Sequence, residues 1–497
     1  MPQVLDPGKA RTIDEFIAEL RLLKAWAGNP SITEITRRIH RDRQRAGRPR
    51  GEWPARSTVG NCFQRGRRRP NSDLLLAVVQ ALVGADEAIL SVWRQSLRAV
   101  LGEAEAAARV SAYDRLPTAP SMFVGRTDLV AQAEDLLAGG RDVPALALEG
   151  MPGVGKTSLA LYLAHRLLAE ERTDAPVLFA NLRGSASQVP PADPAAVLET
   201  FLRLLGTTGD RIPYDLDARA ALYRQQLAGT GALIVLDDAA DAEQLRPLLP
   251  GIRGCRTLIT SRCALTGLGD TTRLSLQPLA LDDAVELLRV TAGADRIAPD
   301  IPAIKQITDL LGHLPLALSV IGRHMRNHPT WALDDYYREP LISLALEDGV
   351  RTALSTSDAR LPKSAQRLLR LLALHPPQKI DTATAAALLD EPRAAAEQHL
   401  ATLTAAHLIE RTTAGRFRLH PLVHAYAEER ICIDETATRI RQALGRLLEH
   451  GRSRDAAVRL ETRALRTLRL PIPRQHAEAD EESRPLQQPH SGRVLAA

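Results

Sequence analysis

The segment Gly-Met-Pro-Gly-Val-Gly-Lys-Thr at positions 150–157 constrains the fold of this chain more than any other feature. It matches a phosphate loop, follows the apolar run Ala145 to Leu148 and precedes a predicted helix from Ser158 to Leu168. Glycines let backbone N–H groups curl around phosphates, Lys156 can neutralise the β and γ oxygens, and the Thr157 hydroxyl can bind Mg²⁺ at the positive end of the helix dipole. This context favours a phosphate loop over a chance glycine-rich turn. The predicted nucleotide-binding residues of the loop are Gly150, Gly153, Gly155, Lys156, Thr157 and Ser158.

Further apolar runs predict a parallel sheet around this loop. Strands are expected at residues 145–148, 177–181, 232–236 and 257–260, with helices between them. Such alternation is typical of a parallel sheet covered by helices. The fold class is therefore predicted to be multidomain, combining α/β and α structure.

Charged residues follow the third and fourth of these strands. Asp237 is predicted to join Thr157 as a ligand of Mg²⁺, and Asp238 is predicted to orient or deprotonate a water molecule. Arg262 is predicted to reach the γ-phosphate, so the candidate catalytic residues are Asp238 and Arg262. A solvated strand end and a surface arginine are the alternatives for these positions.

Length and composition limit the class of protein. A chain of 497 residues exceeds what one hydrophobic core normally organises, so several domains are expected. A composition of 45% hydrophobic and 25% charged residues excludes a wholly disordered or fibrous protein. The four cysteines lack the paired spacing of a disulfide framework or a zinc site, which fits a reducing cytosol. Without a signal-peptide pattern or an apolar run of roughly twenty residues, a cytoplasmic protein with no membrane contact is expected.

Changes of pattern along the chain predict its domains. Three helices, two short strands and a final helix between residues 363 and 430 indicate a winged helix. An Ala, Glu and Pro-rich stretch without a sustained apolar face indicates a linker. The expected segments are a helix-turn-helix-like DNA-binding module (1–105), a linker (106–119), a P-loop NTPase domain (120–277), a helical subdomain (278–345), a winged-helix subdomain (346–430), a helical C-terminal segment (431–470) and a disordered tail (471–497).

Positive charge is concentrated at the front of the chain. Residues 1–70 hold 16 Lys and Arg against 7 Asp and Glu, a net charge of +9, whereas the whole chain carries +5. Twelve arginines lie between positions 37 and 69, which is an electrostatic footprint for phosphates. Helices at 31–39 and 57–64 could form a helix-turn-helix, although about seventeen residues separate them where the motif usually has three or four. The predicted DNA-binding residues are Arg56, Ser57, Thr58, Asn61, Gln64, Arg65, Arg67, Arg68 and Arg69, and a solvated charged face or a protein-docking adaptor is the alternative.

Six motifs follow one another between about residues 120 and 430. They are Phe-Val-Gly-Arg (123–126), the phosphate loop, Leu-Asp-Asp-Ala (236–239), Thr-Ser-Arg (260–262), Gly-His-Leu-Pro-Leu-Ala-Leu (312–318) and Leu-His-Pro-Leu (419–422). In this order they resemble the NB-ARC ATPases, the STAND switch class that includes apoptosome and plant resistance proteins. Leu-Arg-Gly at 182–184 and the helical front module also resemble NB-ARC regulators of actinobacteria.

The resemblance implies roles for single residues. Arg126 would approach the nucleotide base, Pro315 would pack against adenine or ribose, and His420 would touch the β-phosphate of ADP. Residues 278–345 and 346–430 would correspond to the family's ARC1 and ARC2 subdomains. The family's usual His-Asp pair reads His420-Pro421 here, so the contribution of the Asp to the ADP-bound state is missing.

The expected function is an ATP/ADP-dependent STAND switch that regulates transcription, with nucleotide state controlling DNA binding or oligomerisation. Expected cofactors are ATP or ADP with Mg²⁺, and expected partners are an adenine nucleotide, double-stranded DNA and a nucleotide-dependent homo-oligomer. Hydrolysis would be slow, because a switch needs a long-lived state. The alternative is a signalling or defence ATPase whose N-terminal module recruits proteins.

Overall fold

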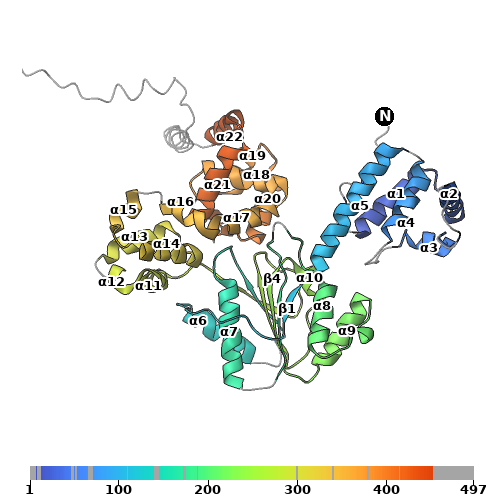
Figure 1. Cartoon of the computed structure of the whole chain (residues 1–497). Helices are drawn as coiled ribbons and strands as arrows, with labels where there is room; N and C mark the ends of the chain where they lie inside the picture. The colour runs from blue at the N-terminus through green and yellow to red at the C-terminus, as the bar shows by residue number, and fades with distance from the viewer. Residues whose placement is uncertain are drawn as a thin grey trace, which may run out of the picture.

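A mainly parallel sheet carries the phosphate loop (Figure 1). We analysed a computed structural model, which describes residues 7, 10, 13–45, 50, 53–64, 71–84, 86–108, 110–138, 145–171, 175–186, 189–297, 300–338, 341–377, 380–412 and 415–450. Within these residues the sheet has six strands in the order β1-β3-β4-β5-β2-β6. The strands are β1 (Ser111–Tyr113), β2 (Ala145–Glu149), β3 (Val177–Asn181), β4 (Leu233–Ala239), β5 (Arg256–Ser261) and β6 (Thr271–Ser275). The four predicted strands are present, and β1 and β6 are additional.

The alternation of side chains in the strands explains the two covered faces. Leu146 and Leu148 of β2 belong to one buried cluster, and Ala145 and Ala147 belong to the other. Helices α6 and α7 lie on one side of the sheet and α8 and α9 on the other (Figure 1). The helical segments of this region are α6 (Thr127–Ala138), α7 (Lys156–Glu171), α8 (Pro194–Leu204), η3 (Gly209–Arg211), α9 (Leu216–Leu227) and α10 (Ala242–Leu245). The sheet is therefore buried on both faces.

Helices follow the sheet in the chain and share one of its cores. The cluster that contains Leu146 continues through Ile304 and Leu368 to Leu447. The segments are α11 (Leu281–Ala292), α12 (Ala294–Ile297), α13 (Ile301–Leu310), α14 (Pro315–Asn327), α15 (Leu333–Arg338), α16 (Leu341–Ala345), η4 (Leu346–Val350) and α17 (Arg351–Ala359). The final part comprises α18 (Lys363–Leu371), η5 (Leu372–Leu374), α19 (Thr382–Leu389), α20 (Arg393–Ala405), β7 (Ile409–Arg411), β8 (Phe417–Leu419), α21 (Pro421–Asp434) and α22 (Ala437–His450). The predicted order of three helices, two strands and a helix is thus present, with β7 and β8 antiparallel.

The N-terminal helices form a core of their own. They are α1 (Ile13–Trp26), α2 (Ile32–Arg45), α3 (Arg56–Asn61), α4 (Ser72–Val83) and α5 (Glu87–Ala108). Phe16 and Trp93, both fully buried, meet edge to face with ring centroids 5.2 Å apart. Ser31 caps α2 by accepting the N–H of Glu34 at 3.1 Å. These five helices therefore have a packing basis independent of the sheet.

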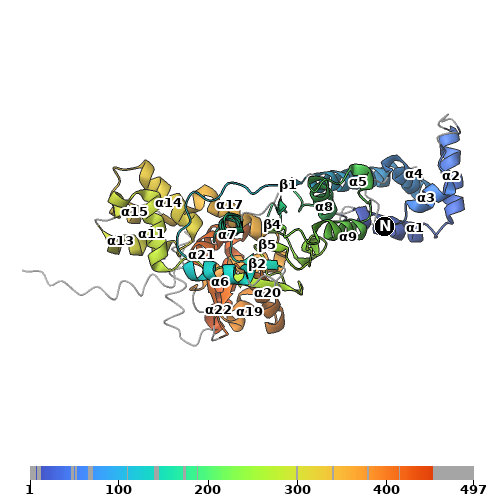
Figure 2. The ribbon, with the colours of Figure 1, turned by 90° about the horizontal axis from the view of Figure 1, so that it is seen from below.

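The expected linker at 106–119 is wrong in part. Helix α5 extends to Ala108, and Ser111–Tyr113 forms β1, which is labelled in Figure 2. This strand pairs antiparallel with β3. A three-residue edge strand with an exposed-intermediate-exposed pattern has too short an apolar signal for sequence reading. The N-terminal helices are thus followed directly by an element of the sheet.

Three further expectations concern membranes, cysteines and the chain end. Within the described part of the chain, no helix is both long and apolar enough to cross a bilayer. All four cysteines are free. The predicted tail at 471–497 and the part of the C-terminal segment beyond His450 lie outside the described residues.

Candidate nucleotide-binding site

The phosphate loop connects β2 to α7 and depends on its glycines. Gly150, Gly153 and Gly155 have φ values of 153°, 80° and 95°, a backbone region that other residues rarely adopt. A Cβ atom at Gly150 would also lie 2.7 Å from the carbonyl oxygen of Leu276. The close approach of the 276 backbone therefore adds to the requirement for glycine here.

Lys156, the first residue of α7, turns its amine into this loop. Its Nζ donates to the carbonyl oxygens of Gly150 at 2.8 Å and Met151 at 2.9 Å. Burial, followed by the nearby Arg262 charge, lowers the pKa of Lys156 to about 7. Ser158, which the sequence also assigned to the loop, lies exposed in the first turn of α7. The Lys156 amine therefore lies inside the phosphate loop, where it is hydrogen-bonded to the loop backbone.

Two predicted metal ligands meet across the sheet edge. The Thr157 hydroxyl donates to Oδ1 of Asp237 at 2.7 Å, and the Thr260 hydroxyl donates to the same oxygen at 2.7 Å. Burial raises the pKa of Asp237, while both hydroxyls act in the opposite direction. A hydroxyl and a carboxylate are the oxygen ligands that Mg²⁺ prefers, usually with waters and phosphate oxygens completing its shell. The described residues contain no cluster of three or more His, Cys, Asp or Glu side chains that could hold a metal ion.

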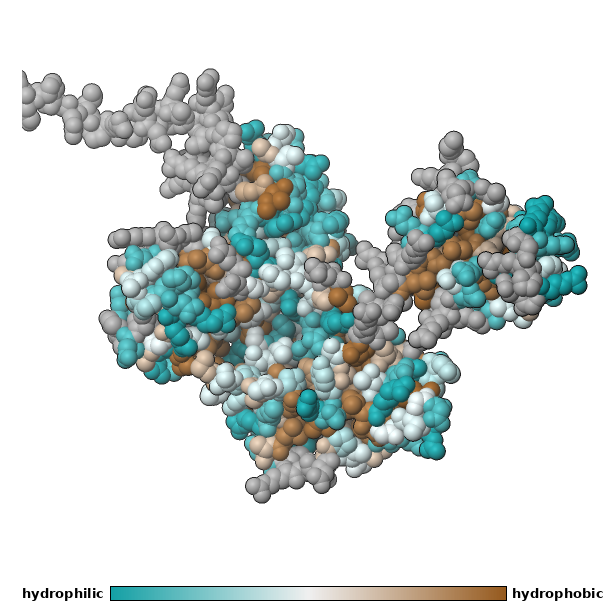
Figure 3. All heavy atoms as spheres, viewed as in Figure 1, coloured by the Kyte–Doolittle hydropathy of each residue, from teal (hydrophilic) through white to brown (hydrophobic). Residues whose placement is uncertain are grey.

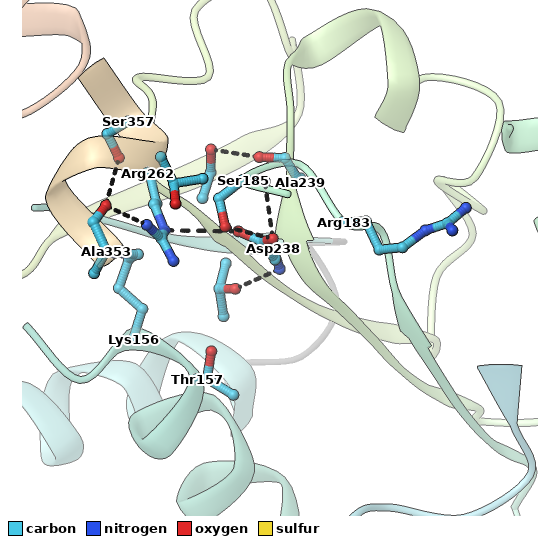
Figure 4. Close-up of polar contacts among 12 residues, drawn as sticks. Lys156, Thr157, Arg183, Ser185, Asp238, Ala239, Arg262, Ala353 and Ser357 are labelled. Atoms are coloured by element: carbon cyan, nitrogen blue, oxygen red, sulfur yellow. Dashed lines mark hydrogen bonds and ion pairs between the residues drawn. The ribbon is translucent and has the colours of Figure 1, made fainter. Parts of the chain in front are cut away.

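Asp238 lies beside this pair and is held by a residue that sequence reasoning missed (Figure 4). Its Oδ2 accepts the backbone N–H of Ser185 at 2.9 Å and the Ser185 hydroxyl at 2.8 Å. Asp238 has a φ of 56°, and its N–H donates to the Thr260 hydroxyl at 2.8 Å. In the sequence, the signal for Ser185 was its position directly after the Leu-Arg-Gly motif. In the structure, a Cβ atom on Gly184 would come within 2.3 Å of the Ala239 backbone. This close approach brings the loop of β3 onto the end of β4.

Arg262 bridges the sheet to α17. Its Nε lies 3.9 Å from Oδ1 of Asp238, and its Nη1 donates to the carbonyl oxygen of Ala353 at 2.8 Å (Figure 4). Burial lowers the pKa of Arg262, and Asp238 and Asp237 oppose that effect. The two candidate catalytic residues are therefore together, with the guanidinium shared between Asp238 and a helix of the following region.

Arg126 and Pro315 both border the phosphate loop. Nη2 of Arg126 donates to the carbonyl oxygens of Val154 at 2.7 Å and Gln277 at 2.9 Å. Burial lowers the pKa of Arg126 to about 10. Pro315 begins α14, and the N–H of the next residue, Leu316, donates to the Gly153 carbonyl at 3.2 Å. The loop is thus contacted from both sides by residues that the motifs singled out.

His420 occupies a position at the start of α21. Its Nδ1 accepts the N–H of Leu422 at 3.2 Å, which leaves Nε2 as the donor to the Gly312 carbonyl at 2.8 Å. Gly312 has a φ of 60°, and a Cβ there would lie 2.3 Å from the His420 ring. Burial lowers the pKa of His420 to about 4. Both ring nitrogens are therefore engaged by backbone groups.

Acid should weaken the fold through His420. Its folded pKa of about 4 lies below the usual 6.5, so the neutral ring is the folded form. The stability it contributes is full above pH 6.5 and is lost as the pH falls towards 4, about 2 kcal/mol of it by pH 5. We expect His420→Asn, which keeps an N-cap acceptor, to flatten this dependence, and urea unfolding of both proteins from pH 7.5 to 5 measures it. Parallel pH profiles would show that His420 does not titrate in this way.

The predicted DNA-binding residues lie on α3 and just after it. Arg56, Ser57 and Thr58 are exposed on α3, Asn61 ends the helix half-buried, and Gln64 is exposed beyond it. Val59 and Phe63 are buried in the core of the N-terminal helices. The predicted helix at 57–64 is too long, since α3 ends at Asn61, and α2 reaches Arg45, so only residues 46–55 separate the two helices. Arg65, Arg67, Arg68 and Arg69 lie outside the described residues.

Comparison with known proteins gives relatives that match part of the chain. The chain is 36% identical over 336 residues to Regulatory protein AfsR of Streptomyces coelicolor, covering 65% of this chain and 33% of AfsR. It is 28% identical over 194 residues to Disease resistance protein ADR1 of Arabidopsis thaliana, covering 38% of this chain and 21% of that protein. The chain thus spans about a third or less of the length of these curated relatives.

Among solved structures, a Signal Transduction ATPase with Numerous Domains (STAND) protein with a tetratricopeptide repeat sensor from Pyrococcus horikoshii matches with 19% identity. That match has a TM-score of 0.32 and covers 71% of this chain and 53% of the other. No family model matches the chain. Over 65% of its length this chain is a homologue of the AfsR regulators, and the resemblance to NB-ARC ATPases of the STAND class, predicted from its motifs, is confirmed.

Proposed function

We propose that the chain binds ATP or ADP with Mg²⁺ at the phosphate loop and uses the bound nucleotide as a switch. The observation that carries this proposal is the convergence of Lys156, Thr157 and Asp237 at the carboxyl ends of β2 and β4. The hydroxyl of Thr157 and the carboxylate of Asp237 would hold Mg²⁺, which supplies charge neutralisation for the phosphates. Lys156 would exchange its loop carbonyl partners for phosphate oxygens.

We assign slow hydrolysis to the same site. Asp238 is the candidate for holding the proton of the attacking water, and Arg262 is the candidate for the γ-phosphate. In the described structure Oδ2 of Asp238 accepts two hydrogen bonds from Ser185, and Nη1 of Arg262 donates to Ala353. Asp238 and Arg262 must each give up or share one of these hydrogen bonds before they can take part in hydrolysis. This requirement fits a protein that retains its bound nucleotide.

The contacts of the loop region support a switch between closed and open arrangements. The Leu316 N–H donates to Gly153, Arg262 donates to Ala353 of α17, and the Ala264 N–H donates to Ala405 at the end of α20 at 2.8 Å. These three bonds tie the sheet to α14, α17 and α20. We propose that residues 346–430 include a winged-helix subdomain and that nucleotide state changes these contacts.

We further propose that the N-terminal helices bind duplex DNA and make the chain a transcriptional regulator. Hydrophilic side chains dominate the outer end of these helices, at the right of Figure 3, where α2 exposes Arg37, Arg41 and Arg45. Together with Arg56 on α3 they would contact phosphates, while Asn61 and Gln64 would contact base edges. The name of the AfsR relatives, regulatory protein, agrees with this role. A recruiting module that assembles proteins on nucleotide exchange is the rival function.

Salt dependence distinguishes the proposed contacts. Each arginine that neutralises a phosphate adds about 0.9 to the slope of log affinity against log salt, so Arg41→Gln, Arg45→Gln and Arg56→Gln should each lower it by up to that amount. Asn61→Ala should leave the slope unchanged and cost roughly 1–3 kcal/mol of sequence preference. Fluorescence anisotropy of the full chain with duplex DNA at four salt concentrations measures both. Arg203→Gln, on the exposed face of α8, is the control.

The rival function makes the opposite prediction. If the folded chain binds no duplex DNA at low salt in its apo, ADP or ATP forms, the DNA proposal fails. Recruitment of proteins by the N-terminal helices then becomes the better function.

A further inference from the structure

A second histidine lies near the phosphate loop and keeps an open ring nitrogen. His407 occupies the turn between α20 and β7 with a φ of 52°, in the left-handed region where Asn, Asp and His are the most frequent residues after glycine. Its Nε2 is buried and has no hydrogen-bond partner among the described residues. A buried polar atom without a partner destabilises a fold, so its presence points to a group that binds there.

The backbone places this turn above the nucleotide site. The N–H of Ala264, two residues after Arg262, donates to the carbonyl of Ala405 at 2.8 Å. The N–H of the next residue, Leu265, donates to the carboxylate of Glu149 at 2.8 Å, and Glu149 is the last residue of β2 before the phosphate loop. Two consecutive bonds thus connect the turn of His407 to the carboxyl ends of β5 and β2.

Electrostatics agree with this placement. Burial and then the positive charge of Lys156 lower the pKa of His407 to about 4, so the ring is neutral and close enough to sense the ammonium. Lys156 and Arg262 bring positive charge to the same place and attract an anion. The carboxylates of Asp238 and Asp237 act on the Lys156 amine in the opposite direction and raise its pKa.

His420 cannot supply this contact in the arrangement described. Its Nδ1 and Nε2 are both used, by the Leu422 N–H and the Gly312 carbonyl. Nε2 of His407, in contrast, has no hydrogen-bond partner among the described residues and can serve a ligand.

Building on the proposed nucleotide site, we propose that Nε2–H of His407 donates a hydrogen bond to an oxygen of the terminal phosphate of the bound nucleotide. The ring then links that phosphate to α20 and β7, while Lys156 contacts it from the phosphate loop. His407 would therefore report whether a phosphate beyond the first is present, because the lysine of a phosphate loop contacts the β and γ phosphates and Lys156 is the loop residue that acts on the His407 ring. The nucleotide and the 363–434 region are thus joined by one side chain that no motif identified.

Substitution by Asn and Gln tests this contact, because both tolerate a polar site and differ in reach. Gln can bring its amide nitrogen near the position of Nε2, whereas Asn reaches only the position of Nδ1, and Asn is well suited to a φ of 52°. We expect His407→Asn to weaken ADP and ATP binding about tenfold or more, as for loss of a hydrogen bond to a charged group, and His407→Gln to stay within about threefold of the wild type. AMP affinity should not change in either variant. Isothermal titration of the full chain with ADP, ATP and AMP measures these values.

His399→Asn is the matched control, since His399 lies on α20 and pairs with Glu391 at 3.0 Å. The inference is overturned if His407→Asn binds ADP and ATP as the wild type does, or if AMP affinity falls in proportion. It is equally overturned if His407→Gln loses as much affinity as His407→Asn. Lys156→Ala in the same titration separates the two proposals: if it too binds normally, the nucleotide site itself is wrong, and if it alone loses binding, only the role of His407 fails.

Discussion

Lys156→Ala should reduce ADP and ATP affinity by about a hundredfold or more. Hydrogen bonds to charged groups contribute about 1.5–3 kcal/mol each, and the ammonium would donate to at least two phosphate oxygens. Since about 1.4 kcal/mol corresponds to a factor of ten, losing two such bonds gives at least the stated effect. Isothermal titration gives the affinities, and identification of nucleotide released from the denatured protein gives an independent measure.

The fold should survive this substitution. The amine donates to the carbonyls of Gly150 and Met151, so its removal costs those bonds but also removes a buried charge. The unfolding free energy should therefore change by no more than about 1–3 kcal/mol. Lys305→Ala, an exposed lysine on α13, is the control and should behave as the wild type. Unchanged nucleotide affinity in a folded Lys156→Ala protein would remove the phosphate-loop assignment.

Asp238→Asn should slow hydrolysis about a hundredfold while changing nucleotide affinity less than about threefold. General bases typically contribute 10²- to 10⁴-fold, and an amide cannot take a proton from water. Asn accepts the φ of 56°, and its oxygen can still accept from Ser185, so the loop geometry should persist. Lys156, Thr157 and Asp237 remain for binding. Single-turnover release of phosphate from bound ATP measures the rate.

A neighbouring carboxylate offers the control for this variant. Asp241 caps α10 by accepting the N–H of Gln244 at 2.8 Å, and Asn caps helices equally well. Asp241→Asn should therefore leave both rate and affinity unchanged. An equal loss of binding and hydrolysis in Asp238→Asn would instead make Asp238 a metal ligand or a structural residue.

The local parts of the fold and of the site could be predicted from sequence. The phosphate loop is bounded by a strand and a helix whose apolar patterns are continuous in the chain, so Lys156 and Thr157 were identified with their surroundings. Asp237 and Asp238 follow an apolar strand directly, and parallel strands bring their carboxyl ends to one edge. Helices were also predicted to begin near positions 31 and 57, and α2 and α3 begin at Ile32 and Arg56.

Contacts between distant segments could not be predicted. Ser185 meets Asp238 only because the loop after β3 approaches β4 closely at Gly184, and no periodicity encodes that approach. The partner of Arg262 is a backbone carbonyl of α17, ninety-one residues away in sequence, and carbonyls carry no residue signature. His420 lies in a motif and His407 does not, and only the structure shows that both nitrogens of His420 are bonded while Nε2 of His407 has no partner among the described residues.

The edge strand β1 connects the N-terminal helices mechanically to the sheet. A load applied to those helices reaches β1 first, because Ser111 follows the end of α5 and lies opposite Asn181 of β3. The Asn181 side chain accepts the N–H of Arg183 at 2.9 Å, two residues before Ser185. Elements with few buried contacts can open locally at a free energy well below that of global unfolding, so we expect β1 to separate from β3 before the rest of the sheet unfolds. Tension that detaches β1 would leave β3 paired only with β4 and make it the edge of the sheet, and the loop after β3 carries Ser185, which binds the proposed base Asp238.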